Sequence, residues 1–183
     1  ETIDERNSPL KATEAAAQLM LSNFRLLKSW PFAVTAHNHG AGGLIKASKR
    51  WNTKNLADII DKHTSKSFGF ASENFYCEFL AALHSEKYQE EIFGIIPKHE
   101  PLMAEDSILR HNIRIGTLAD LVGLTLEEIK LYNPDLKSRN VTMRTLLPQS
   151  YRIRLPLGRK AKLDLYYQRA DEARPQIRKN VGA

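Results

Sequence analysis

The sequence has a single cysteine, no long apolar run, and no excess of either charge over most of its length. Cys77 alone excludes an internal disulfide framework and a cysteine-rich zinc site. No stretch approaches the roughly 20 apolar residues that a membrane-spanning helix needs. The polar start, residues 1–6, is unlike a signal peptide, and without an initiator Met we expect a fragment or a processed chain. What remains is a globular chain of 183 residues, long enough for one domain or two small ones.

The positive charge of the chain is concentrated at its end. Residues 1–150 carry 18 Lys or Arg against 18 Asp or Glu, whereas residues 151–183 carry nine against three. Proteins that bind nucleic acid usually carry clustered cations, because contacts to phosphate release counterions. The balanced body therefore disfavours a DNA-binding domain, and only the basic end leaves that function open.

Apolar residues recur at helical spacing through the first half of the chain. Ser8 and Pro9 are typical of a helix start, and an apolar stripe follows them. We expect this stripe to be buried; its members are Ala12, Ala16, Leu19, Met20, Phe24 and Leu27. Further helices are predicted over residues 32–38, 44–49 and 56–62, with a longer one capped by Ser72. The first 95 residues or so are thus predicted to be all helical.

Two prolines within five residues, Pro97 and Pro101, resist both helix and central strand and mark a domain boundary. Beyond them the pattern predicts a strand at 112–115, two short helices around Gly123, and a second strand at 151–155. The predicted divisions are a helical domain (1–96), a linker (97–105), a small strand-helix-helix-strand domain (106–157) and a basic tail (158–183). The predicted fold class is mainly α, and α+β overall.

The most unusual stretch is the one from His37 to Gly43, where a predicted helix runs into a glycine-rich turn. A His-Asn-His metal nuclease needs a hairpin that this helical context lacks. A metal site on His37 and His39 is weak, because residues two apart on a helix point to different sides. A phosphate-binding loop would need a preceding strand and a Lys-Ser or Lys-Thr pair. A helix cap with incidental histidines is the structural alternative.

Three segments of the first half stand in a defined order. The residues that carry the pattern are Asp4, Arg6 and Pro9, then Ala36, Asn38, Gly40 and Gly42, then the stretch 68–83. They resemble the second half of the lysozyme-like domain of bacterial lytic transglycosylases, glycoside hydrolase family 23, and most of all the membrane-bound lytic murein transglycosylase D group. That family has a tyrosine where this chain has His37, and a second tyrosine facing the cleft where this chain has Phe75 followed by Tyr76.

The resemblance implies that this chain supplies one wall of a glycan cleft. The implied substrate-binding residues are His37, Asn38, Gly40, Gly42, Phe75 and Tyr76, with Tyr76 favoured over Phe75 because it keeps the hydroxyl. The family's catalytic glutamate is followed by Ser and lies before the Asp-x-Arg segment. No Glu of this chain is followed by Ser. We therefore assign no catalytic residue, and we interpret Glu5, Glu14, Glu73 and Glu78 as surface or cap charges.

The second half has a resemblance of its own. Residues 117–134, 147–148 and 151–156 resemble a divergent LysM module, a unit that binds glycans containing N-acetylglucosamine, although its usual Gly-Asp-Thr is reduced to Gly116 and Thr117. A helix-turn-helix is the alternative, but the acidic second helix is a poor one to place against phosphate. A structural cap without a ligand is also open.

Together these resemblances imply part of a peptidoglycan lytic transglycosylase of the bacterial envelope, periplasmic or outer-membrane associated. The implied partners are glycan strands and an N-terminal part of the same protein, with no cofactor, no metal and no nucleic acid, and with a membrane reached only through an N-terminal anchor. The family forms a 1,6-anhydro sugar with the substrate's own hydroxyl, so one acid suffices. The alternatives are a non-catalytic peptidoglycan scaffold and a nucleic-acid binder that uses residues 159–183.

Overall fold

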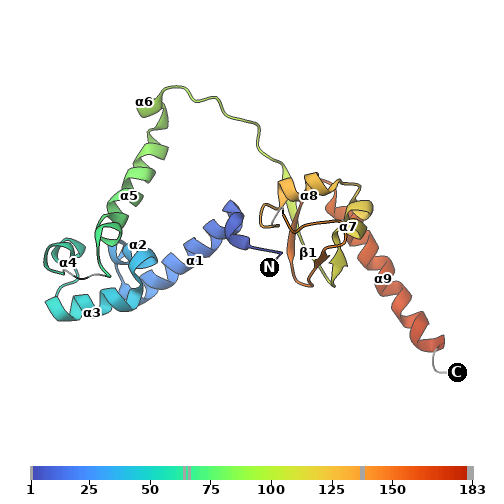
Figure 1. Cartoon of the computed structure of the whole chain (residues 1–183), viewed down its shortest axis with the longest axis horizontal. Helices are drawn as coiled ribbons and strands as arrows, with labels where there is room; N and C mark the ends of the chain where they lie inside the picture. Colours follow the sequence, from blue (N-terminus) through green and yellow to red (C-terminus); the bar gives the residue numbers. More distant parts are fainter. Residues whose placement is uncertain (1, 64, 66, 137–138, 181–183) are drawn as a thin grey trace. The chain divides into compact units, whose positions relative to one another are not determined.

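The computed structural model describes residues 2–63, 65, 67–136 and 139–180, and its contacts divide the chain into two units. One unit comprises Glu1–Ala12 and His99–Ala183, and we call it the strand unit. The other comprises Thr13–Lys98, and we call it the helical unit. Helices predominate and the strands form two small antiparallel sheets, which confirms the α+β class (Figure 1). None of the described helices combines the length and the apolar character needed to cross a bilayer.

The helical unit is built around a buried helix. Its elements are α1 (Pro9–Leu27) from Thr13 onward, α2 (Trp30–His39), α3 (Ala41–Trp51), α4 (Leu56–Lys62), α5 (Phe70–Lys87) and α6 (Gln89–Phe93). In α2 every residue from Phe32 to Ala36 is buried, because this helix packs against both α3 and α5. The core of the unit consists of Phe32, Ala36, Leu44, Ala47, Leu56, Ile59 and Phe68. The one strand-like contact described here is an isolated bridge between Ser65 and Phe68.

Two local predictions for this unit are wrong in detail. Gly40 ends α2 with a φ of +86°, but α3 begins at the next residue, so Gly42 lies inside a helix and not in an open turn. Ser72 does not cap α5, because the helix begins at Phe70 with Gly69 as its N-cap residue. In both cases the helix extends further toward its N-terminus than glycine and serine propensities suggest.

The predicted burial of the α1 stripe is also wrong. Among the described residues of α1 only Asn23 is buried, and Leu19 of the predicted stripe is 47% exposed. Helical spacing shows that a helix has an apolar face, but it does not show that another element covers that face. Leu27 packs against the core and Phe24 stacks on Trp30, while Ala16 and Met20 stay half-buried and Leu19 is exposed, so the stripe is covered only in part.

The strand unit joins segments that are far apart in sequence. Strand β1 (Ala104–Ile108) pairs antiparallel with β4 (Arg152–Pro156), and β2 (Ile113–Arg114) pairs with β3 (Leu146–Leu147). The intervening helices are α7 (Ile115–Val122) and α8 (Leu126–Tyr132), and a 3-10 turn, η1 (Glu5–Asn7), lies near the start of the chain. The predicted first strand at 112–115 is therefore too long: Ile115 begins α7, and the main partner of β4 is β1. Strand β1 was not predicted, because its charged residues Glu105 and Asp106 interrupt the alternation of apolar and polar residues that is typical of a strand.

Capping and one buried amide hold α8 in place. Thr125 and Glu128 form a capping box in which each side chain accepts the other's backbone N–H. These hydrogen bonds from Thr125 lower the pKa of the Glu128 carboxyl. Beyond the helix, Asn133 is buried and fully used: its Nδ2 donates to the carbonyls of Ile129 and Arg154, each at 2.8 Å, and its Oδ1 accepts from the Arg154 N–H at 2.8 Å. Asn133 thereby ties α8 to β4.

The segment predicted to be a basic tail is partly built into the core. It forms α9 (Lys160–Asn180), and Leu163 and Tyr167 are buried with the core residues of the strand unit. The Tyr167 hydroxyl accepts a hydrogen bond from the Arg110 N–H at 3.1 Å, and burial raises the pKa of this phenol. The first turns of α9 thus belong to the domain that was predicted to end at residue 157.

The first residues of the chain also belong to the strand unit and not to the predicted helical domain. The Asp4 N–H donates to the Asp135 carbonyl at 2.8 Å. The Lys11 Nζ lies 2.6 Å from Oδ2 of the buried Asp135, and the Tyr151 hydroxyl donates to the same oxygen at 2.8 Å. Burial, and then the charge of Asp135, raise the pKa of Tyr151 far above its ordinary value. Such long-range pairing is invisible in local sequence patterns.

Candidate functional site

The end of α2 and the first half of α5 place an aromatic pair at the surface of the helical unit. The rings of His37 and Phe75 are stacked, with centroids 5.7 Å apart and an interplanar angle of 21°. His37 is exposed and Phe75 is half-buried, so the pair has a face open to solvent. An exposed stacked pair of this kind can bind a flat apolar face of a ligand while the imidazole nitrogens keep their hydrogen-bonding capacity.

Asn38 lies beside this pair and is held by α5. The Ser72 hydroxyl donates to Asn38 Oδ1 at 2.8 Å, and Ser72 itself is buried. Because the serine occupies the amide oxygen, the Asn38 NH₂ group stays a donor for an incoming acceptor. Local sequence patterns identified Asn38 but interpreted Ser72 as a helix cap, so its role as the residue that orients Asn38 was missed.

The glycines beside the pair leave the surface open. An added Cβ at Gly40 or Gly42 would meet no described atom within 4 Å. Gly43 differs, because a Cβ there would collide with the imidazole of His39. His39 is held in turn, with Nδ1 2.9 Å from the Ser67 carbonyl oxygen and its ring edge-on to Phe68 at 4.9 Å. His39 is therefore a packing residue, whereas Gly40 and Gly42 border open space.

Tyr76 lies in a different place from Phe75. It packs against the core of the helical unit and lines a hollow of about 300 Å³ together with Pro31, Lys54 and Ile60. Neighbours on a helix diverge by about 100°, and here it is Phe75 that meets His37. Of the six predicted binding residues, the structure brings together His37, Asn38 and Phe75, with Gly40 and Gly42 following Asn38 in the chain, and it separates Tyr76 from them.

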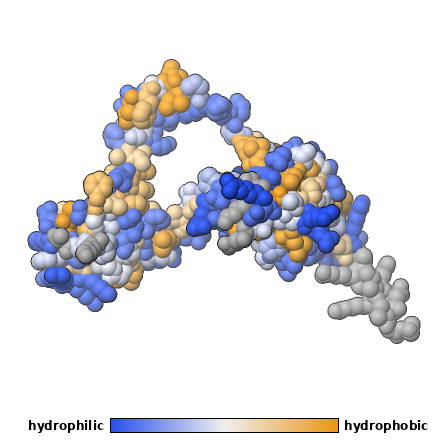
Figure 2. All heavy atoms as spheres, viewed as in Figure 1, coloured by the Kyte–Doolittle hydropathy of each residue, from blue (hydrophilic) through white to orange (hydrophobic). Residues whose placement is uncertain are grey.

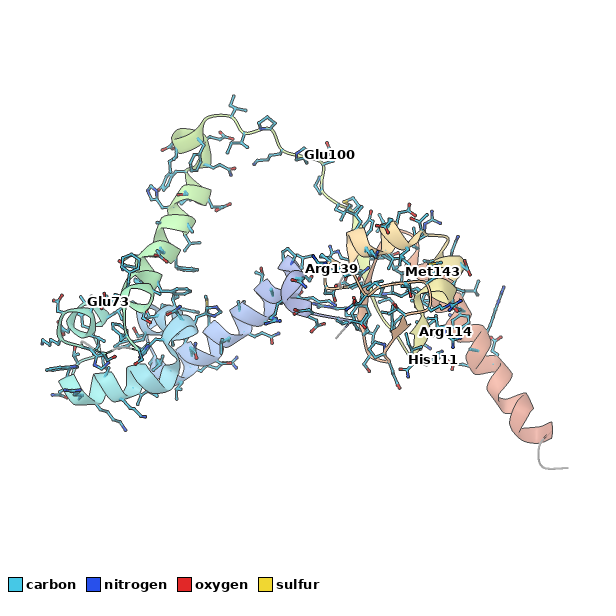
Figure 3. The ribbon with its side chains drawn as sticks, in the orientation of Figure 1. Glu73, Glu100, His111, Arg114, Arg139 and Met143 are labelled. Carbon is cyan, nitrogen blue, oxygen red and sulfur yellow. The ribbon has the colours of Figure 1, made fainter. Side chains whose placement is uncertain are left out.

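Acidic groups near the aromatic pair are few. Glu73, which Figure 3 labels in the first turn of α5, is half-buried, and Glu78 is exposed. Glu5 and Glu14 are exposed as well. Across the described residues, no three His, Cys, Asp or Glu side chains gather in a way that could hold a metal ion.

The strand unit carries a second surface of interest, where the start of α7 meets the loop before β3. The Gly116 N–H donates to the Met143 carbonyl at 2.8 Å, and the Ile115 N–H donates to the Thr145 carbonyl at 2.9 Å. A Cβ at Gly116 would lie 2.9 Å from the Met143 oxygen, so only glycine allows this approach. Exposed Arg114 and Met143 flank the junction, and Figure 3 labels both.

Comparison with known proteins gives no family for this chain, because no protein-family model and no curated protein sequence matches it. The function is therefore inferred from these two surfaces, namely the α2–α5 surface (His37, Asn38, Gly40, Gly42, Phe75) and the junction of Gly116 with Met143. Both carry neutral or basic hydrogen-bonding groups beside an apolar side chain. This combination suits a neutral, hydroxyl-rich ligand better than a metal ion.

Proposed function

We propose that this chain contributes one wall of the glycan-binding cleft of a bacterial peptidoglycan lytic transglycosylase. The observation that carries the proposal is the α2–α5 surface, where the His37–Phe75 stack, the Asn38 amide and open backbone at Gly40 and Gly42 adjoin one another. A pyranose ring has an apolar face and a polar rim, and these groups fit both. The resemblance of the three motifs to glycoside hydrolase family 23 supports the same function and a lysozyme-like fold for this unit.

The roles of the residues follow from their chemistry. Asn38 donates from its NH₂ to an acetamido or hydroxyl oxygen of the glycan, and Ser72 keeps that amide in position. Phe75 supports the sugar face, since Tyr76 lies in another hollow. His37 orients a hydroxyl through a ring nitrogen. Binding of this kind positions a glycosidic bond but does not break it, because cleavage needs a proton donor for the leaving oxygen.

The proton donor is proposed to lie outside this chain. Glu5, Glu14 and Glu78 are exposed and Glu73 is half-buried in the first turn of α5, and no Glu of this chain is followed by Ser as the catalytic glutamate of the family is. We infer that an N-terminal part of the same protein supplies the acid, and that the 6-hydroxyl of the muramic acid then closes a 1,6-anhydro ring without water. This reaction places the protein in the bacterial envelope, where its substrate is.

A second candidate function is a non-catalytic glycan-binding module. The observation that favours it is the order β1, β2, α7, α8, β3, β4, with β1 paired to β4, β2 paired to β3, and both helices between the two halves of each pair in sequence. This order supports a LysM-like fold for the strand unit. The junction of Gly116 with Met143 would then be the glycan contact, and the α2–α5 surface would be structural.

Co-sedimentation with purified sacculi distinguishes these functions. We expect the chain to bind, and Asn38→Ala with Phe75→Ala to weaken binding roughly tenfold or more, because a hydrogen bond and an aromatic contact are each worth about 1 kcal/mol. Asn74→Ala is the matched control, since this α5 asparagine donates to the Phe70 carbonyl beside the site. Arg114→Ala with Met143→Ala tests the strand unit in the same assay.

The outcomes point in different directions. Loss of binding only in the Asn38 and Phe75 variant supports the cleft function, and loss only in the Arg114 and Met143 variant supports the glycan-binding module. Mass spectrometry of the supernatant tests catalysis: release of 1,6-anhydromuropeptides by this chain alone would show that it holds its own acid. Failure of the wild-type chain to bind sacculi would contradict both functions.

A further inference from the structure

A hollow with an apolar floor and a cationic rim lies between the end of α1 and one side of α3. Its volume is about 270 Å³. The floor includes the buried Phe32 and Leu44, and Leu26 at the rim is 61% exposed. Lys28, Lys49 and Lys54 also line it. We call this surface the lysine hollow. It is separate from the α2–α5 surface, and it shares only Lys54 with the hollow that Tyr76 lines.

The charge around the lysine hollow is of one sign. Residues 15–57 contain six Lys or Arg and no Asp or Glu. Three of these cations, Lys46, Lys49 and Arg50, are exposed on α3. Lys49 and Arg50 follow Lys46 by three and four residues, so all three lie toward one side of the helix. Figure 2 shows hydrophilic residues along this helix. In the described part of the chain no salt bridge joins Lys28, Lys49 or Lys54 to a carboxylate, so their charge is available to a ligand.

The backbone at the rim is also unusual. Lys28 follows the last residue of α1 with a φ of +56°, in the left-handed region that glycine or asparagine normally occupies at a helix end. A lysine at this position is less favourable than glycine. This backbone conformation nevertheless places the Lys28 ammonium group at the rim of the hollow. Backbone strain of this kind often occurs at functional positions.

The form of the hollow selects among anionic partners. It is too small to serve as the groove for a partner helix, whose interface would bury hundreds of Å² on each side. Nucleic acid would use the cations but not the exposed Leu26 or the apolar floor. An anionic lipid uses both, because its phosphate meets ammonium groups while its acyl chain meets leucine and phenylalanine.

We propose that the lysine hollow docks the helical unit on a bilayer that contains anionic phospholipid. Lys28, Lys49 and Lys54 bind lipid phosphates, and Leu26 inserts at the level of the acyl chains. This docking goes beyond the proposed glycan function and needs neither a transmembrane helix nor a covalent anchor. It would hold the helical unit against a membrane surface while the α2–α5 surface binds glycan.

Flotation with vesicles tests the proposal without peptidoglycan. We expect the full chain to float with vesicles of equal parts phosphatidylglycerol and phosphatidylcholine, and not with phosphatidylcholine alone. Lys28→Gln, Lys49→Gln and Lys54→Gln together should weaken binding roughly 100-fold, because each cation near an anionic surface contributes about fivefold. The matched control removes Lys62, Lys87 and Lys98 in the same way, since these lysines lie outside the hollow, and should change binding by less than about threefold.

Two further variants test the apolar part and guard against misfolding. Leu26→Asn should weaken flotation severalfold, whereas Leu83→Asn, at another exposed leucine, should not. Lys28→Gly relieves the left-handed φ, so it should keep or raise the melting temperature while it weakens flotation about fivefold. This variant separates loss of the charge from loss of the fold.

Several outcomes would overturn the proposal. They are a wild-type chain that ignores anionic vesicles, equal losses in the hollow and control variants, and binding that is indifferent to Leu26. Full displacement from vesicles by a mixed-sequence oligonucleotide, with the same lysine dependence but no leucine dependence, would assign the hollow to nucleic acid instead. Failure of sacculus binding has no bearing on any of these results.

Discussion

The two units contrast in how they use their apolar and polar residues, although their lengths are similar. Fifteen described hydrophobic residues form the buried core of the strand unit, against seven in the helical unit. Large apolar side chains are exposed on both units, among them Phe70 at 78% and Ile95 at 93% on the helical unit and Leu131 and Leu157 at 63% each on the strand unit. Contiguous apolar exposure marks interaction surfaces in soluble proteins. The contrast teaches that the strand unit encloses the larger core, while both units keep apolar surface that a partner could cover.

Polar groups follow the same contrast. In the strand unit Asp135 and Asn133 are buried and hold distant segments together through Lys11, Tyr151 and Arg154. The helical unit also buries Asn23, Thr35 and Ser72, but the polar side chains of its candidate site, His37 and Asn38, lie at the surface. Buried polar networks fix a structure, because a partner that is lost leaves an unsatisfied group behind. Exposed ones remain available to ligands.

The largest effect that would sharpen this contrast is expected from Asp135→Ala. The substitution removes the acceptor that the Lys11 ammonium and the buried Tyr151 hydroxyl share. Lys11 keeps its ion pair with the exposed Glu5 at 3.2 Å, so we expect a loss near the lower end of the about 3–5 kcal/mol that breaking a buried pair costs. Urea unfolding should show this loss in the strand unit. Hydrogen exchange should leave α2 and α5 protected as before.

Two comparisons control this prediction. Asp171→Ala removes an exposed carboxylate that pairs with Arg110, and it should cost no more than about 1 kcal/mol. Replacing all three partners, with Lys11→Met, Asp135→Leu and Tyr151→Phe, should recover most of the lost stability, because neither a charge nor a hydroxyl is then left buried without a partner. An equal loss for Asp135 and Asp171 would show that the strand unit does not depend on its buried network.

A smaller effect is expected at the glycines of the helical unit. Gly40→Ala forces a side chain into a φ of +86°, which should destabilise the unit by about 1–3 kcal/mol and displace the end of α2. Gly42→Ala is the matched control: it adds the same methyl group into open space within α3 and should be neutral or slightly stabilising. Thermal unfolding followed by circular dichroism measures both, and an equal effect at the two positions would contradict this account.

The smallest expected effect concerns the capping box of α8. Thr125→Ala should cost the strand unit about 1 kcal/mol at neutral pH, since it removes one hydrogen bond to a free helix amide. The folded pKa of Glu128 lies below its ordinary value of 4.5, so its contribution is present above that value and is lost as pH falls through the folded pKa.

The pH dependence provides the check. Unfolding of the wild type and of Thr125→Ala, measured at neutral pH and again well below pH 4.5, should differ less in acid than at neutrality. A difference that stays constant with pH would show that the hydrogen bond from the Thr125 hydroxyl to the Glu128 carboxylate contributes nothing to stability.

Much of the helical unit was predictable because its signals are local. The helix over residues 32–38 and the one over 56–62 were expected within a few residues of α2 and α4, and the prolines at 97 and 101 lie close to the division at His99. Pro31 and Gly40 act through the conformation of the residues next to them, so reading them needs no knowledge of the fold. The strands were harder: β1 carries Glu105 and Asp106, and only its pairing with β4 makes it a strand.

The candidate site was predictable in part for the same reason. The motif on α2 predicted His37 and Asn38 as binding residues, and the pattern on α5 predicted Phe75 and Tyr76. Which of the two aromatic residues meets His37 depends on the rotation of α5 about its own axis, and the structure favours Phe75. Ser72 was missed because a serine near a helix start looks like a cap until its hydroxyl is seen on Asn38.

The sequence by itself determined where most helices of the first half lie to within a few residues, that the class is α+β, and which segment of α2 carries the polar motif, because capping, proline and glycine act locally. Only the tertiary structure decided that Ile3 pairs with Leu136 and Lys11 with Asp135, that α9 enters a core, and that the lysines after α1, on α3 and after α3 share one hollow. These outcomes depend on contacts between residues far apart in the chain, and such contacts form only when the whole unit folds.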